Sequence, residues 1–313
     1  MKNITVLGAS GFIGSHLVDR LIDNGYFVKI LIRRPLAELN IRNIKNHRLK
    51  IYNGEIENID LLTTIISKDD IVFDLASPST PYSSSQFPVT EISDHIIPHV
   101  SLLQRIYEIG IKKFIFISSG GGLYGGNYKR SIKETDIVQP MSPHAIGKAT
   151  IEYYMNYFSH KYNIPQLIFR VSNPYGPGQV QKNGFGLIPT LFSCIRDNVQ
   201  PILYDNGEAI RDFIYIDDLI DAMISSFDKI NLYHTYNIGS GRGTKINEAW
   251  SVIKKLTKSD IFPILAPKRD FDINRYVLNV DKFSTEFQWI SSTTLSDGLK
   301  NTWEWINSSK NKL

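Results

Sequence analysis

The sequence predicts an α/β fold, a doubly wound parallel sheet followed by a smaller carboxyl-terminal lobe. Short apolar segments rich in Ile, Val and Phe alternate with amphipathic segments up to about residue 172. Segments that are apolar on both faces suit parallel strands covered by helices. The alternation implies right-handed crossovers within one sheet. After residue 173 the elements become shorter, which indicates a second lobe.

Six segments are predicted to be strands of the main sheet, in chain order. They are NITVLG (3–8), FVKILI (27–32), LKIYN (49–53), IVFDLA (71–76), KFIFIS (113–118) and QLIFRV (166–171). Apolar residues that recur every three or four positions predict helices between them. The clearest helical patterns cover residues 12–24, 89–110 and 144–162.

The second lobe begins where Pro and Gly cluster, in NPYGPGQ (173–179). A strand DFIYI (212–216) and a final helix from about residue 294 are expected within it. We expect the first domain to consist of residues 1–173 with parts of 205–240, and a discontinuous lobe to consist of residues 174–313.

Composition argues against several classes of protein. The chain is 42% hydrophobic with no run long enough to form a transmembrane helix, and its amino terminus lacks the features of a signal peptide. The single cysteine, Cys194, cannot form an internal disulfide and suits a reducing cytoplasm. The net charge is +4, and the basic segment 41–50 is interleaved with apolar residues. We therefore expect a cytoplasmic protein without nucleic-acid or membrane partners.

The segment VLGASGFIG (6–14) predicts a dinucleotide site. Gly8 permits a tight turn after a strand, Gly11 lets the backbone approach a pyrophosphate, and Gly14 allows close packing of helix on sheet. A glycine triplet alone also occurs for structural reasons. Here it has the required strand–turn–helix context, and parallel strands follow.

The residues after the second predicted strand bear on the choice of dinucleotide. An Asp or Glu there would accept hydrogen bonds from the adenosine ribose of NAD. This chain instead has Arg33 and Arg34, in ILIRRPLAE. A guanidinium can bind a 2′-phosphate bidentately, so NADP(H) is favoured, with NAD possible. The alternative is two solvated arginines beside a loop.

A series of motifs along nearly the whole chain resembles one enzyme family. They are GASGFIG, DLASP (74–78), FISSGGGLYG (116–125), the stretch around Lys148, RVSNPYGPGQ (170–179), RDFIYIDDL (211–219) and NIGSGRGT (237–244). Together they resemble the extended short-chain dehydrogenase/reductases that act on nucleotide sugars. The pattern is most similar to the branch with sugar-nucleotide 4-epimerases and dTDP-4-keto-6-deoxyhexose reductases of O-antigen pathways. The resemblance implies a Rossmann-type cofactor domain, a lobe for the nucleotide sugar and a homodimer.

The resemblance also implies binding residues. Those for the dinucleotide are Gly8, Ser10, Gly11, Phe12, Ile13, Gly14, Arg33, Arg34, Glu55, Ile56, Leu75, Ala76, Ser77, Ser118 and Lys148. Those for the nucleotide sugar are Ser79, Thr80, Asn173, Leu187, Ile188, Tyr204, Arg211 and Arg269. Two arginines and an amide would clamp two phosphates. The alternatives are solvated surface arginines and, for the two hydroxyl residues, a flexible loop.

The catalytic positions depart from the family pattern. Family members use a Ser or Thr, a Tyr that moves a proton as hydride passes to or from nicotinamide, and a Lys that binds the nicotinamide ribose. Lys148 is present, but MSPHAIGKATIE has His144 where the tyrosine is expected. Residues 120–122, where the Ser or Thr is expected, are all glycine, and Ser118 and Ser119 are the nearest hydroxyls upstream.

Histidine can in principle replace the tyrosine. Reducing a ketone places negative charge on oxygen, which a proton donor quenches. An ordinary histidine has a pKa of about 6.5, and cationic Lys148 would lower it. His144 would be mostly neutral at pH 7 and donate through an N–H, or as a minor imidazolium population. Alternatively His144 only fills space, and Ser119, Tyr124 or Ser142 is the donor, although Tyr124 could be a packed aromatic.

Other chemistries are disfavoured. The seven histidines show no metal-ligand spacing, so no metal is predicted. The segment SSGGG lacks the nucleophile turn G-x-S-x-G of a hydrolase.

Three hypotheses for function follow. The first is NADPH-dependent reduction of the C4 ketone of a nucleotide-linked 4-keto-6-deoxyhexose, such as dTDP-4-keto-6-deoxyglucose, for surface polysaccharide. Its product would be a dTDP-6-deoxyhexose such as dTDP-fucose. The second is an NAD-dependent UDP-hexose 4-epimerase, favoured by the motif set. The third is a noncatalytic homologue, against which Lys148, Asn173 and Arg211 argue.

Overall fold

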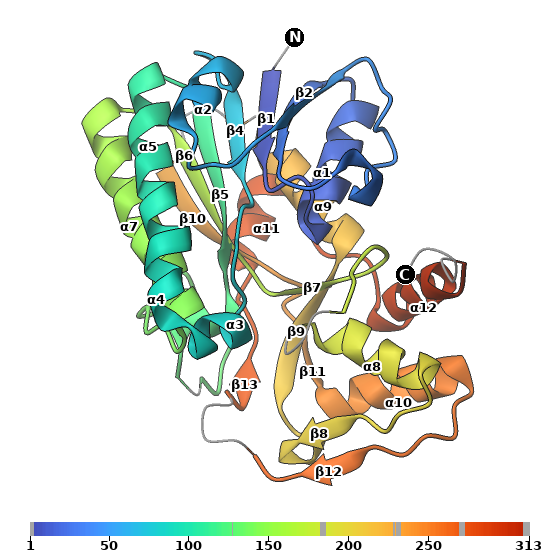
Figure 1. The fold of residues 1–313 in the computed structure, drawn as a ribbon. Coiled ribbons are helices and arrows are strands. Elements are labelled where there is room, and N and C mark those ends of the chain that lie inside the picture. Colours follow the sequence, from blue (N-terminus) through green and yellow to red (C-terminus); the bar gives the residue numbers. More distant parts are fainter. Residues whose placement is uncertain are drawn as a thin grey trace.

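The computed structural model describes residues 3–126, 128–181, 186–227, 229, 233–268 and 273–308. Its centre is a seven-stranded sheet in the order β10-β6-β5-β4-β1-β2-β3 (Figure 1), in which every pairing is parallel. The strands are β1 (Asn3–Leu7), β2 (Phe27–Ile32), β3 (Leu49–Asn53), β4 (Ile71–Asp74), β5 (Lys113–Ser119), β6 (Gln166–Val171) and β10 (Tyr233–Ile238). The predicted fold class and the six predicted strands are confirmed. Strand β4 ends two residues earlier than expected.

Helices cover both faces of this sheet, as the apolar strands require (Figure 1). Every residue of β4 and of β6 is buried. On one face lie α1 (Phe12–Asp23) and α9 (Ile216–Ser226). On the other face lie α2 (Ile59–Ile65), α5 (Ile97–Ile109) and α7 (Pro143–Tyr162). Because all the strands are parallel, their carboxyl ends meet at one edge of the sheet, where α1 and α7 begin.

The helix expected over 89–110 is broken into three pieces, which corrects the sequence prediction. They are α4 (Pro88–Glu91), a π turn (Ile92–Ile96) and α5. Pro98 has no N–H for an i−4 bond and its ring crowds the preceding turn, so the chain widens there. Glu91 directly precedes the π turn, and His95 lies within it. Such turns are frequent at functional sites.

The lobe is built around a second, four-stranded sheet with the order β11-β9-β13, in which β7 also pairs with β9. Its strands are β7 (Asn173–Tyr175), β9 (Ile210–Tyr215), β11 (Gly243–Lys245) and β13 (Arg275–Tyr276), and β8 (Ile202–Tyr204) pairs separately with β12 (Ile264–Ala266). The helices nearby are α8 (Leu187–Arg196), α10 (Ile246–Thr257) and α12 (Leu295–Ser308) (Figure 1). The strand expected at 212–216 and the final helix are confirmed. Within the described part of the chain, no helix is long and apolar enough to cross a membrane.

Buried Asp212 ties the two sheets together. It lies on β9, and its carboxylate accepts hydrogen bonds from the backbone N–H (2.8 Å) and hydroxyl (2.7 Å) of Ser240, just after β10. The backbone N–H of Leu278 donates to the same carboxylate at 3.2 Å. A side chain on Gly239 would lie 2.5 Å from the carboxylate, so glycine is required there. The lobe is thus anchored to the last strand of the large sheet.

Candidate active site

The glycine-rich turn between β1 and α1 has the shape that a dinucleotide needs. Gly8 has a φ of +79°, and a Cβ on it would lie 2.6 Å from the carbonyl carbon of Leu75. A Cβ on Gly14 would lie 2.3 Å from the carbonyl oxygen of Gly8. By contrast, a Cβ on Gly11 would meet only the carbonyl oxygen of Gly8, at 3.2 Å. The first and third glycines are therefore required by packing, and the second leaves an open approach for phosphate at the start of α1.

The order of strands places this turn at the switch point of the sheet. Strand β1 is flanked by β2 and β4, and the chain moves outward in opposite directions from them. Dinucleotides bind in the crevice above such a point. Leu75 and Ala76 are half-buried and Ser77 is exposed directly after β4, while Ser10, Phe12 and Ile13 are half-buried beside the turn. The residues present fit a bound dinucleotide.

Arg33 and Arg34 directly follow β2, the strand next to β1, and both are exposed. They follow Ile32, whose carbonyl accepts a hydrogen bond of 3.0 Å from the backbone N–H of Gly54, after β3. Glu55 is exposed one residue further on, and Ile56 is half-buried. The structure thus keeps both guanidinium groups at the edge where the adenosine ribose of a dinucleotide is expected.

Helix α7 presents His144 and Lys148 one turn apart on one face. Ser142 caps the helix, and its hydroxyl oxygen accepts a hydrogen bond from the backbone N–H of Ala145 at 3.2 Å. The ammonium of Lys148 donates to the carbonyl of Ile117 at 3.0 Å and lies 4.5 Å from the ring centre of Phe116. Burial lowers the pKa of Lys148 to about 8.

Both the backbone and the ring of His144 make hydrogen bonds to serine hydroxyls. Its backbone N–H donates to the hydroxyl of Ser84 at 3.1 Å, and its Nδ1 lies 3.0 Å from the hydroxyl of Ser79. Burial lowers the pKa of His144 to about 3; Lys148 also lowers it and Glu91 raises it. The expected neutral imidazole is therefore present at pH 7. The expected minor imidazolium population is not supported, because burial penalises the cation.

Glu91 and His95 complete a cluster that the sequence analysis missed. The hydroxyl of Ser79 donates to Glu91 Oε2 at 2.5 Å, and His95 Nδ1 lies 2.5 Å from Glu91 Oε1. A Cβ on Gly147 would lie 2.2 Å from Glu91 Oε1, so this glycine makes room for the carboxylate against α7. Ligand atoms of Glu91, His95 and His144 all lie within 4.8 Å of one another, close enough to hold a metal ion. The only sequence signal was the four-residue spacing of Glu91 and His95.

Tyr124 is the packed aromatic, the alternative expectation for this residue. Its hydroxyl donates to Asn237 Oδ1 at 2.7 Å and accepts from Arg170 at 2.9 Å, and burial raises its pKa to about 12. The hydroxyl of Ser118 is also engaged, donating to buried Glu152 at 2.5 Å. Ser119 is half-buried at the end of β5. It remains the candidate hydroxyl on this strand.

Two of the three glycines at 120–122 have a packing reason. A Cβ on Gly120 would lie 2.7 Å from Leu278 and one on Gly121 would lie 2.9 Å from the ring of Tyr276. Tyr276 ends β13 of the lobe sheet, and Leu278 lies in the segment that follows it. Gly122 has room, since a Cβ there would meet Ala145 at an ordinary 3.4 Å. The missing Ser or Thr is thus explained at the first two positions by side chains that fill its space.

The substrate residues implied by the resemblance are not all brought together. Ser79 contacts His144, and Thr80 caps the short helix α3 (Pro81–Gln86). Asn173 donates from its amide to the carbonyl of Asp212 at 2.9 Å, and Arg211 donates to the carbonyl of Ile273 at 2.8 Å. The remaining residues are Tyr204 at the end of β8, Leu187 and buried Ile188 at the start of α8, and Arg269, which lies outside the described residues.

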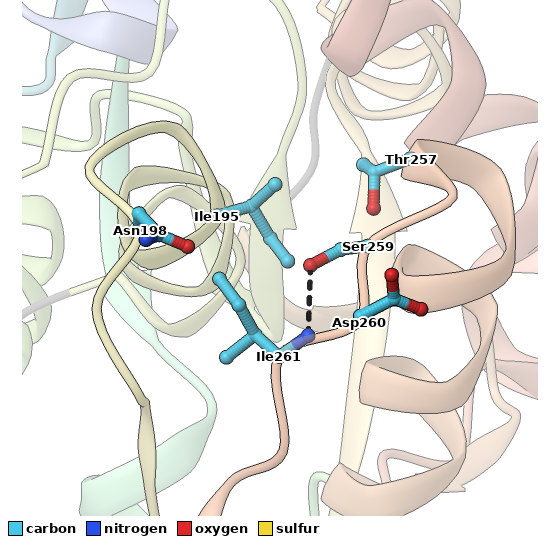
Figure 2. Close-up of a pocket in the computed structure, with 6 residues that line it drawn as sticks. All are labelled: Ile195, Asn198, Thr257, Ser259, Asp260 and Ile261. Carbon is cyan, nitrogen blue, oxygen red and sulfur yellow. Dashed lines mark hydrogen bonds between the residues drawn. The ribbon is translucent and has the colours of Figure 1, made fainter.

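A separate surface pocket of about 510 Å³ lies between α8 and the segment after α10. It is lined by Ile195, Asn198, Thr257, Ser259, Asp260 and Ile261 (Figure 2). The hydroxyl of Ser259 accepts a hydrogen bond from the backbone N–H of Ile261 at 3.2 Å. The pocket contains none of the predicted site residues.

Comparison with known proteins identifies the family. Residues 4–239 match the NAD dependent epimerase/dehydratase family. The chain belongs to this family. The putative UDP-glucose 4-epimerase of Methanocaldococcus jannaschii is 31% identical over 97% of this chain and 98% of that protein. The dTDP-4-dehydro-6-deoxyglucose reductase of Escherichia coli is 26% identical over 95% of each chain.

Solved structures give the same result. The UDP-glucose 4-epimerase of Thermotoga maritima, with UDP-glucose, has a TM-score of 0.90 and 31% identity and covers 99% of this chain and 100% of that one. The predicted resemblance to extended short-chain dehydrogenase/reductases that act on nucleotide sugars is confirmed. The family member described here is an NAD(P)-dependent enzyme.

Proposed function

We propose that the enzyme uses NADPH to reduce the C4 ketone of a nucleotide-linked 4-keto-6-deoxyhexose. The observation that carries this proposal is the pair of exposed arginines, Arg33 and Arg34, directly after β2, where an NAD site would have an acid. A 2′-phosphate would accept charge-assisted hydrogen bonds from these groups. The relative from Escherichia coli named as a dTDP-4-dehydro-6-deoxyglucose reductase supports the substrate class.

The chain's own residues then have defined tasks. The turn at Gly11 and the start of α1 bind the pyrophosphate, and Lys148 binds the nicotinamide ribose. The dinucleotide, when bound, supplies the hydride for C4. His144 passes a proton to the oxygen that becomes the new hydroxyl, and Ser119 orients that oxygen. The reaction is reduction of a ketone to an alcohol without a covalent enzyme intermediate.

We assign the nucleotide diphosphate to the lobe. Asn173 and Arg211 lie on adjacent strands of the lobe sheet, β7 and β9. With Arg269 they form the proposed phosphate clamp, while Tyr204 and the start of α8 take the base. We assign Ser79 and Thr80 to the hexose side, where Ser79 acts through its contact with His144.

A second candidate, an NAD-dependent UDP-hexose 4-epimerase, is favoured by the relatives of higher identity. Epimerisation needs a group that removes a proton from the C4 hydroxyl and later returns it. The contacts of His144 with Ser79 and of Ser79 with Glu91 suit transfer in both directions.

The two candidates are separated by coenzyme and substrate. Oxidation of NADPH would be followed with dTDP-4-keto-6-deoxyglucose, with NADH as the control, and UDP-glucose would be incubated with enzyme and NAD. We expect rapid NADPH oxidation and a dTDP-6-deoxyhexose product. Formation of UDP-galactose without net coenzyme oxidation would instead establish the epimerase and remove the reductase proposal.

We also propose a homodimer formed through α7. Ile146, Tyr153 and Tyr157 are exposed at seven- and four-residue spacing, which places them in one apolar stripe on this helix. Apolar stripes of this kind mark interaction surfaces. Light scattering should give twice the chain mass of 35.7 kDa. A Tyr153→Glu/Tyr157→Glu variant should be monomeric; an unchanged dimer would place the interface elsewhere.

A further inference from the structure

The proposed function leaves two buried groups behind His144 without a role. Glu91 is 2% exposed and His95 is fully buried. A buried carboxylate is costly unless it is hydrogen-bonded, and both oxygens of Glu91 are engaged, one by Ser79 and one by His95. The residues of the cluster come from three separate segments. Ser79 lies in the loop after β4, Glu91 and His95 lie at the π turn, and His144 lies on α7. Such an arrangement needs an explanation beyond packing.

The contacts determine which hydrogen lies where. An ionised carboxylate can only accept, so the single hydroxyl hydrogen of Ser79 points to Glu91. The hydroxyl oxygen of Ser79 must then accept from His144, whose Nδ1 is 3.0 Å away. His144 therefore carries its hydrogen on Nδ1, and its Nε2 has a free lone pair. The chain of hydrogen bonds thus links the ring of His144 to the carboxylate of Glu91.

We propose that Ser79 and Glu91 form a proton relay behind His144, in which the carboxyl of Glu91 stores the proton that His144 delivers to the sugar oxygen. The relay deepens the proposed function and rests on it only in taking His144 as the group that exchanges a proton at C4. It applies to reduction and to epimerisation alike. Ser79 and Glu91 act through His144 and are positioning residues.

The proton balance in the reducing direction is as follows. The ionised arrangement first takes up one proton from solvent at Nε2 of His144, which is half-buried, and the relay passes a proton on to Glu91. Glu91 is then protonated and donates to Ser79, Ser79 donates to Nδ1 of His144, and Nε2 of His144 carries a hydrogen. As hydride forms the new C–H bond and the C=O π bond breaks, the Nε2 hydrogen moves to the sugar oxygen. The hydroxyl hydrogen of Ser79 moves to Nδ1, and the proton of Glu91 moves to Ser79. The end state is the ionised arrangement deduced above, and the imidazole stays neutral throughout.

A metal ion fits these contacts less well. Binding one to Glu91, His95 and His144 would break both hydrogen bonds to the carboxylate. It would also place a dication beside buried Lys148, whose charge already lowers the pKa values of His95 and His144. Transfer of a proton along existing hydrogen bonds requires no such rearrangement.

The surroundings are built for this pair of groups. Gly147 on α7 leaves the space that Glu91 occupies, and a Cβ there would also lie 3.1 Å from His95 Nδ1. The charged or titratable groups that influence the cluster are Lys148 of α7, Asp74 of β4, His99 of α5 and Glu152 of α7. Among the residues that the structure describes, His95 Nε2 has no hydrogen-bond partner.

The first test reads the tautomer of His144 directly and needs no substrate. Protein with ¹⁵N-labelled histidine would be examined by long-range ¹H–¹⁵N correlation at pH 7. We expect an Nδ1–H tautomer for His144 in the wild type. In Glu91→Gln the new amide donates to Ser79, whose hydroxyl then turns to Nδ1, so His144 should switch to Nε2–H. In Ser79→Ala, Nδ1–H loses its acceptor and the same switch is expected.

Ser84→Ala is the matched control, because Ser84 bonds the backbone of His144 and not its ring. It should retain the Nδ1–H tautomer. A wild-type Nε2–H tautomer, or Nδ1–H retained in both Glu91→Gln and Ser79→Ala, would overturn the relay. Histidine ¹⁵N shifts that change on treatment with EDTA would show a bound metal and overturn it as well. If Glu91→Gln does not fold, Ser79→Ala decides alone, since Ser79 is only half-buried.

The second test uses whichever nucleotide sugar the enzyme converts. Ser79→Ala and Glu91→Gln should each lower kcat at least about 100-fold, the lower range for loss of general acid catalysis, with KM changed less than about twofold. If a variant loses activity only to the extent that it loses folded protein, and the tautomer of His144 is unchanged, the residue has a structural role only. That result would overturn the relay. If neither reduction nor epimerisation occurs, the proposed function fails, while the tautomer measurement still decides the relay.

Discussion

The two ends of the nucleotide crevice are built in opposite ways. At the cofactor end, a single segment from Gly8 to Gly14 makes the turn. A side chain on any of its three glycines would meet backbone of the same segment or of the adjacent strand end. At the catalytic end, His144, Ser79 and Glu91 come from three segments and meet through side chains. The first end follows the family pattern and the second departs from it.

The difference shows which part of an enzyme of this family can change. A phosphate site made of backbone N–H groups and a helix start depends on backbone shape, which few substitutions preserve. A proton-transfer site depends on side chains, and another donor can serve if its neighbours supply the missing function. Here histidine replaces the expected tyrosine, and Ser79 and Glu91 accompany it. The following predictions test this division, in order of decreasing effect.

His144→Phe should affect chemistry alone. The ring volume is kept, but the proton donor is lost, so we expect turnover to fall about 1,000-fold. Binding of NADPH, measured by calorimetry, should change less than about twofold, because the glycine turn is untouched. Full turnover in this variant would move the donor to Ser119 and end the proposed role of the histidine.

Gly14→Ala should have the opposite effect. Its Cβ would lie 2.3 Å from the carbonyl oxygen of Gly8, so α1 must move away from β1. We expect a loss of about 3 kcal/mol, which is about 100-fold in affinity for NADPH. Calorimetric titration measures it, and the ¹⁵N tautomer of His144 is the control that should not change. Unaltered affinity would show that the turn does not bind the dinucleotide.

Gly147→Ala tests the space behind His144. The added Cβ would lie 2.2 Å from Glu91 Oε1 and should displace the carboxylate from Ser79. We expect about 2 kcal/mol less stability toward urea and about 30-fold slower turnover. Gly122→Ala, whose Cβ meets only ordinary contacts, should unfold at nearly the wild-type urea concentration. Equal behaviour of the two variants would argue against a tightly packed cluster.

Arg33→Ala/Arg34→Ala should change coenzyme choice only. Loss of the charge-assisted hydrogen bonds to a 2′-phosphate should lower the preference for NADPH over NADH about tenfold. The ratio of kcat/KM values for the two coenzymes measures it. A ratio that stays constant would favour NAD as the natural coenzyme and, with it, the epimerase.

An effect of similar size is expected from pH. Burial lowers the pKa of Lys148 to about 8, and lysine is charged below its pKa. The cation proposed to hold the nicotinamide ribose is therefore lost as pH rises through about 8, and kcat/KM for NADPH should fall about tenfold between pH 7 and pH 9. Lys148→Arg keeps its charge and should flatten this decline. A flat wild-type profile to pH 9 would exclude Lys148 as its source.

The sequence by itself determined the large sheet, the glycine turn and the family. Strands with apolar residues on both faces, glycines at Gly8, Gly11 and Gly14, and the motifs around Lys148 are local patterns, and local patterns specify backbone shape directly. The helix over 89–110 was predicted in the right place but without its π turn, whose cause is the distortion around Pro98. Strand β10 was missed because its sequence, YHTYNI, has few aliphatic residues.

Only the tertiary structure decided the chemistry behind His144. Ser79, Glu91 and Gly147 are distant in the chain, and their contacts depend on how α3, the π turn and α7 pack at the edge of the sheet. Tertiary packing likewise assigned Tyr124 to the core and filled the space beside Gly120 and Gly121. The physical reason is that hydrogen bonds and close contacts act over a few ångströms in space, whatever the separation of the residues in sequence.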